Sequence, residues 1–170
     1  MSRVLINRYL AKIDELRAVS GRSNEQIICP AFRRLLEDWA ADRKLIFLEE
    51  YQIDTAQKTK VRPDCAILHD IRVPLGWWEA KDTGDDLDTE IAKKLRRGYP
   101  QDNILFEDST TAVLIQNRAE VMRAAMTDVA ALDRLLTLFF GYERPEIAEF
   151  RKAVAQFSTD LPIPEVARAW

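Results

Sequence analysis

The stretch "GWWEAKD", residues 76–82, places two tryptophans directly before a glutamate and a lysine. Successive side chains of a strand point to opposite faces, so Trp77, Glu79 and Lys81 share one face and Trp78 lies on the other. Large aromatic side chains mostly pack inside proteins, so both tryptophans are expected in the core. The stretch therefore predicts a strand that crosses a core and reaches a site at Glu79 and Lys81.

A second acid is expected beside this strand. The preceding segment "VRPDCAIL" (61–68) is predicted to be a strand, and "HDIR" (69–72) has the composition of a turn. If the two strands pair through that turn, Asp64 lies close to Glu79. Adjacent carboxylates repel each other unless a cation holds them, and such pairs are what Mg²⁺ prefers. Lys81 is then placed to stabilise developing negative charge or to help a water molecule lose a proton.

A third acid, Glu25, comes from an expected helix over residues 24–41. It lies on the same apolar stripe as Ile28 and Phe32, where a glutamate is costly unless it has a partner. The alternative is an ordinary glutamate in an exposed first turn, which the helix dipole favours. The spacing leaves both interpretations of Glu25 open.

The remaining pattern alternates helices and strands. Helices are expected over 3–19 and 88–97 and from residue 118 onward, and strands over 45–53, 73–81, 103–108 and 111–116. This order predicts an α/β sandwich in which helices flank a central mixed sheet of about five strands, with a helical C-terminal part. We expect a core over 1–117, and C-terminal helices over 118–170 that pack on it and lead to a connector.

Composition narrows the class of protein. With 170 residues, 47% hydrophobic and 31% charged, the chain has the character of one globular domain. Its apolar runs are shorter than the roughly 18–20 residues that span a bilayer, and the N-terminal segment lacks a signal-peptide pattern. Cys29 and Cys65 suggest no disulfide framework, which makes a cytoplasmic location the expectation. The single histidine, His69, argues against a histidine-based zinc site or a serine–histidine triad.

The pattern Pro63-Asp64, fourteen intervening residues and then Glu79-Ala80-Lys81 resembles the signature of the PD-(D/E)XK nuclease superfamily. Over residues 5–117 the chain is similar to the N-terminal nuclease domain of large single-chain restriction–modification proteins, the type ISP and related type IIG enzymes. The segments that carry this similarity are "NEQIICPAFRRLLEDWA", "VRPDCAIL", "GWWEAKDTGDDLD" and "GYPQDNILFEDSTTAVLIQN".

The resemblance implies a restriction-endonuclease-like fold and a Mg²⁺-dependent deoxyribonuclease, with Mn²⁺ able to substitute. Asp64, Glu79 and the backbone carbonyl of Ala80 would hold the metal, and Lys81 would be the catalytic lysine. Glu25 would be the acid on the helix, acting directly or through water. Gln101 is a weaker correspondence, because it follows Pro100 where related nucleases carry a glutamine on a helix.

The implied partners are double-stranded DNA, helicase or methyltransferase domains of a longer protein, and a second copy on DNA. The net charge of −3 does not indicate a nucleic-acid binder, but two basic blocks would contact backbone phosphates: Lys58, Lys60 and Arg62, and then Lys93, Lys94, Arg96 and Arg97. Two alternatives stay open. One is a nuclease-like fold that binds DNA or serves as a scaffold without catalysis, and the other is a nuclease of the same superfamily with a different substrate, such as a Holliday junction.

Overall fold

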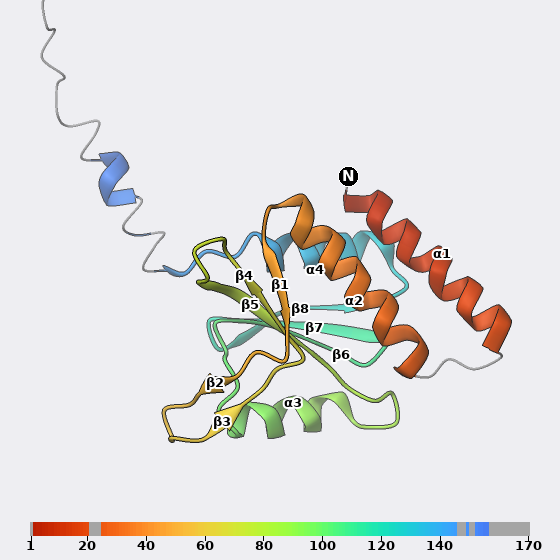
Figure 1. The fold of residues 1–170 in the computed structure, drawn as a ribbon, viewed down its shortest axis with the longest axis horizontal. Helices are drawn as coiled ribbons and strands as arrows, with labels where there is room; N and C mark the ends of the chain where they lie inside the picture. The colour runs from red at the N-terminus through yellow and green to blue at the C-terminus, as the bar shows by residue number, and fades with distance from the viewer. Residues whose placement is uncertain (1, 21–24, 146–148, 150–151, 157–170) are drawn as a thin grey trace, which may run out of the picture.

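The computed structural model describes residues 2–20, 25–145, 149 and 152–156. Six strands form one sheet in the order β1-β4-β5-β6-β7-β8 (Figure 1). Only β5 and β6 pair in parallel within this sheet, and the other neighbours are antiparallel. The strands are β1 (Ile46–Glu49), β4 (Cys65–Leu68), β5 (Pro74–Ala80), β6 (Asn103–Glu107), β7 (Thr111–Gln116) and β8 (Ala119–Ala125).

Helices cover both faces of this sheet, as Figure 1 shows. One face, which includes Trp78, packs in a single apolar cluster with α1 (Ser2–Ser20), α2 (Glu25–Asp42) and α4 (Val129–Phe140). The opposite face, which includes Trp77, packs with α3 (Leu87–Arg96) and with a small hairpin of β2 (Ile53–Asp54) and β3 (Lys60–Val61). Both tryptophans are buried, as expected. The predicted α/β sandwich around a mixed sheet is confirmed.

Two predicted strands are each broken into two pieces. The strand expected over 45–53 stops at Glu49, because Glu50 adopts a left-handed φ of 52° that strands do not use. The strand expected over 61–68 divides at Pro63, because proline lacks the N–H that a sheet requires. The pieces 53–54 and 60–61 leave the main sheet and form the β2–β3 hairpin.

The prediction of a helix from residue 118 onward is wrong over its first part, because residues 119–125 form the edge strand β8. Asn117 and Arg118 both have positive φ, 50° and 68°, which is the geometry of a tight two-residue hairpin turn. This turn folds the chain back onto β7 and overrides the helix propensity of the alanines. Helix α4 begins only at Val129, after Asp128 accepts a hydrogen bond from the backbone N–H of Ala131 at 3.0 Å.

Among the residues beyond α4, 152–156 are helical, as expected. The rest of the segment expected to lead to a connector, 157–170, lies outside the described residues. None of the helices in the described part of the chain is long and apolar enough to cross a membrane.

Gly76 is needed where β5 meets β6 and α4. A Cβ at this position would lie 2.5 Å from Asn103 Nδ2 and 2.8 Å from Phe139 Cε2. The Asn103 side chain, which is fully buried, donates to the carbonyls of Leu75 at 3.0 Å and Phe139 at 2.9 Å. The missing side chain of Gly76 therefore leaves room for the amide that ties β5 to the end of α4.

We expect Gly76→Ala to lower the free energy of unfolding by about 1–3 kcal/mol, as overpacking of a core does. Urea denaturation followed by circular dichroism measures this change. Gly84→Ala is the matched control, because its Cβ would meet no neighbour closer than 3.8 Å. Equal stability of the two variants would contradict the close packing at Gly76.

Candidate active site

The candidate site lies where β4 begins and β5 ends. The antiparallel register pairs Cys65 with Trp78, so Asp64 stands opposite Glu79. The two ends are bonded reciprocally: the backbone N–H of Ala80 donates to Asp64 Oδ2 at 2.8 Å, and the backbone N–H of Asp64 donates to Glu79 Oε2 at 3.3 Å. The structure therefore brings the two predicted carboxylates together, held by the backbone of each other's strand.

Lys81 completes the trio that the sequence predicts. Its backbone N–H donates to the carbonyl of Glu107 on β6 at 2.7 Å, which holds the chain just beyond the end of β5. Its ammonium donates to Glu79 Oε1 at 2.6 Å. The Lys81 side chain is 12% exposed and the Glu79 side chain only 2%. A buried carboxylate needs such a partner, because an isolated charge is costly away from water.

A second lysine, Lys94 of α3, joins the same carboxylate. Its ammonium contacts Glu79 Oε1, and it also donates to the hydroxyl of Tyr99 at 3.0 Å. The Tyr99 hydroxyl in turn donates to the carbonyl of Arg62 at 3.0 Å. Lys94 was expected among the phosphate contacts, and the structure places it in the site instead. Tyr99 was not predicted, and only its position after the basic block at 93–97 hints at it.

The electrostatics of the pair favour a cation. Burial and then the negative charge of Glu79 raise the pKa of Asp64, against the hydrogen bond from Ala80 and the two lysine ammonium groups. The ionised pair is therefore formed at a cost in free energy. A divalent cation between the two carboxylates would offset that cost.

The oxygen donors fit Mg²⁺, which is usually held by one or two carboxylates together with water and substrate phosphate. Asp64 and Glu79 supply the carboxylates, and the carbonyl of Ala80 directly follows Glu79 in the chain. Within the described residues, however, no three acids, cysteines or histidines gather as a metal-binding group. Glu25, the expected third acid, is the first residue of α2, and its side chain lies outside the described part.

Gln101 does not join these residues. It precedes β6, whereas the site lies beyond the other end of the parallel pair β5 and β6. There it lines a small polar groove with Asp102, Asn117 and Arg118. The weaker correspondence drawn from the resemblance therefore finds no support in the position of this side chain.

Glu107 is an acid that the sequence interpretation missed. It ends β6, pairs in register with Ala80, and is 1% exposed. Its Oε2 accepts a hydrogen bond from the backbone N–H of Ser109 at 2.6 Å. Burial is the larger cause of the raised pKa of Tyr9 on α1, and the negative charge of Glu107 is the next cause. The Glu107 carboxylate therefore belongs to the face that the helices α1 and α2 cover. The available signal was the glutamate at the end of an apolar run.

The two basic blocks lie next to each other. The β2–β3 hairpin carries Lys58 and Lys60, and it runs beside the end of α3 in Figure 1. The approach is close, because a Cβ on Gly98 would lie 2.9 Å from Thr55 Cγ2. The blocks contain five cationic side chains besides Lys94 and Arg62, and all of them are exposed: Lys58, Lys60, Lys93, Arg96 and Arg97. Arg62 is exposed as well, and it pairs with Glu50 at 3.3 Å.

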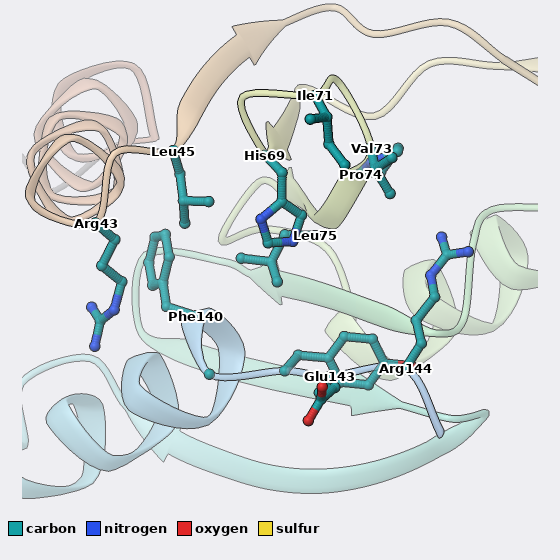
Figure 2. A pocket seen from close by; sticks show the side chains of 12 residues that line it. Arg43, Leu45, His69, Ile71, Val73, Pro74, Leu75, Phe140, Glu143 and Arg144 are labelled. Carbon is teal, nitrogen blue, oxygen red and sulfur yellow. The ribbon is translucent and has the colours of Figure 1, made fainter. Parts of the chain in front are cut away.

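A groove of about 600 Å³ lies at the other end of β4 and β5. Figure 2 shows Leu45, Leu75 and Phe140 around it, with His69 directed inward from the turn between the strands. The lining is mainly apolar and includes neither Asp64 nor Glu79. The acid–lysine cluster is therefore separate from this groove.

Comparison with solved structures finds a clear similarity. The chain matches a chain in a cryo-electron microscopy structure titled as a DrdV–DNA complex, with a TM-score of 0.84 and 42% sequence identity. The match covers 93% of this chain and 16% of that chain, so this chain spans about a sixth of the length of its neighbour. The fold is restriction-endonuclease-like. No protein-family model and no curated protein matches the sequence.

The raised pKa of Asp64 predicts how the metal-free protein responds to pH. Because the folded state holds this proton more tightly than the unfolded state, stability falls as pH rises through the interval between the two pKa values. Asp64→Asn removes the charge and keeps an oxygen that can accept from Ala80. We expect it to raise the melting temperature at pH 7 in EDTA slightly, because solvent screens much of the repulsion at the exposed Asp64.

The gain should disappear below about pH 3.9, the ordinary range of aspartate, where the wild-type side chain is protonated too. Differential scanning fluorimetry across pH measures both effects. Asp70→Asn, in the exposed turn at the other end of the same hairpin, is the control and should show no such gain. A lower melting temperature of Asp64→Asn at pH 7 would contradict the assigned repulsion.

Proposed function

We propose that this chain is a Mg²⁺-dependent endonuclease of the PD-(D/E)XK type, which hydrolyses phosphodiester bonds of double-stranded DNA. The observation that carries the proposal is the cluster of Asp64, Glu79 and Lys81 at one end of β4 and β5. The similarity to a chain of a DrdV–DNA complex supports DNA as the partner. The large uncovered part of that chain supports a role as the cleavage domain of a longer restriction–modification protein, with helicase or methyltransferase domains beside it.

The residues divide the work of hydrolysis. A bond from water to phosphorus forms, the bond from phosphorus to the leaving sugar oxygen breaks, and a proton moves from the water to that oxygen. Asp64, Glu79 and the Ala80 carbonyl would hold Mg²⁺, which supplies Lewis-acid stabilisation of the phosphate when bound. The Lys81 ammonium lies beside the Glu79 carboxylate, where it would meet charge developing on the phosphate oxygens. Glu25, at the start of α2, would support the metal directly or through water.

The exposed cations of the β2–β3 hairpin and of α3 would lie along the DNA backbone. Lys58, Lys60 and Arg62 come from one element, and Lys93, Arg96 and Arg97 come from the other. Contacts with phosphates position a duplex without reading its sequence. The cleavage position would therefore be set by other parts of a longer protein or by a second copy on DNA.

Cleavage of supercoiled plasmid with and without Mg²⁺ tests the proposal. The wild type is expected to convert plasmid to nicked or linear forms only with Mg²⁺ or Mn²⁺, and both Asp64→Ala and Lys81→Ala should lose at least about a hundredfold in rate. Lys81→Ala should still gain melting temperature from Mn²⁺, because the ammonium acts on phosphate and water. Asp64→Ala should not gain it.

Asp70→Asn is again the matched control and should cut like the wild type. DNA binding by the wild type with no cleavage under any metal condition would favour the alternative, a nuclease-like fold that acts as a binding or scaffold module. Metal-independent cleavage, or cleavage unchanged in Lys81→Ala, would contradict the assigned chemistry.

Residues 1–170 alone should bind duplex DNA weakly and without sequence preference. The net charge is −3, and several of the cations in the basic blocks are already paired with acids. Backbone contacts of this kind give dissociation constants of about 10⁻⁴–10⁻⁶ M at physiological salt. A gel-shift titration with two unrelated duplexes measures this, and nanomolar binding to one of them would contradict the expectation.

A further inference from the structure

The position of Lys94 follows from the helix that carries it. Leu87 and Ile91 are the buried residues of α3, and Lys94 lies three residues after Ile91 on the same face. Its side chain is only 16% exposed, although the neighbouring Lys93 is 46% exposed and pairs with Glu90. The helix therefore directs the Lys94 ammonium at the sheet instead of at solvent.

This ammonium shares one oxygen with Lys81. Both lysines contact Glu79 Oε1, while Glu79 Oε2 accepts from the backbone of Asp64. Two carboxylates and two ammonium groups thus balance in charge without any metal. A divalent cation bound at Glu79 would leave the cluster with two excess positive charges, so one ammonium has to withdraw.

Tyr99 gives Lys94 somewhere to withdraw to. The ammonium already lies 3.0 Å from the Tyr99 hydroxyl and 4.7 Å from the centre of its ring, and both can hold a cation. Lys81, in contrast, follows directly on the strand that carries Glu79, and its backbone is tied to Glu107. Lys94, on the separate element α3, therefore has a second partner within reach.

We propose that Lys94 is a positioning residue, which holds Glu79 in the metal-free protein and competes with the divalent cation for that carboxylate, with Tyr99 as its second partner. This inference rests on the proposed metal-dependent function. The inference predicts tighter metal binding when Lys94 loses its charge and weaker metal binding when Tyr99 loses its hydroxyl. A purely structural role of Lys94 and Tyr99 would weaken metal binding in both cases.

Isothermal titration calorimetry with Mn²⁺, without DNA, tests it. Lys94→Met keeps the length of the side chain and removes the charge. It should bind Mn²⁺ at least about tenfold more tightly, because even in water a unit charge about 4 Å from a divalent ion repels it appreciably. Tyr99→Phe keeps the ring but removes the hydroxyl that accepts from Lys94, and it should bind Mn²⁺ several-fold more weakly.

Lys93→Met is the matched control, since it removes the same charge from the same helix without a contact to Glu79, and its affinity should stay within about twofold of the wild type. Lys94→Arg keeps the positive charge at this position, and its affinity for Mn²⁺ should stay within about threefold of the wild type. If Lys94→Met does not fold, Tyr99→Phe and Lys94→Arg decide the matter. Equal Mn²⁺ affinity in Lys94→Met and wild type, or tighter Mn²⁺ binding in Tyr99→Phe, would overturn this inference and leave the proposed function standing. A wild type that binds no Mn²⁺ at all overturns the proposed function as well.

Discussion

The burial of the Glu79 carboxylate is the constraint on which the site depends. A side chain that is 2% exposed carries a charge that water cannot reach, so the protein must supply its partners. The backbone N–H of Asp64, directly before β4, is one partner. Lys81, directly after β5, is the second, and Lys94 of α3 is the third. Three separate parts of the chain therefore meet at one carboxylate, and the position of α3 on the sheet is coupled to the charge at the end of β5.

This arrangement also explains why the two tryptophans precede the glutamate. Trp77 anchors β5 in the apolar cluster that packs against α3. Trp78 anchors it in the cluster on the opposite face, which packs against α1, α2 and α4. A strand fixed on both faces has little freedom at its end. Glu79 and Lys81 are thus held by packing as well as by hydrogen bonds, which suits a site whose groups must keep their positions while a charged substrate arrives.

The surface around the site has an uneven charge that the net value hides. The exposed lysines and arginines gather on the β2–β3 hairpin and on the last turns of α3, whereas the loop before α3 is acidic. These cations come from two separate segments of the sequence, which approach each other closely where Gly98 packs against Thr55. The acidic N-terminal turn and the basic C-terminal turn of α3 also match the dipole of the helix.

Local patterns in the sequence determined the strand over 74–80, the alternation that puts Glu79 and Lys81 on one face, and the hairpin that brings Asp64 beside them. Each of these depends only on residues close together in the chain, where strand period and turn composition are informative. They did not determine β8, because the positive φ of Asn117 and Arg118 overrode the helix propensity of the residues that follow. Nor did they place Lys94 in the site or Gln101 away from it. Those positions depend on how α3 packs across the sheet and on the parallel pairing of β5 with β6, which are contacts between distant segments that only the tertiary structure decided.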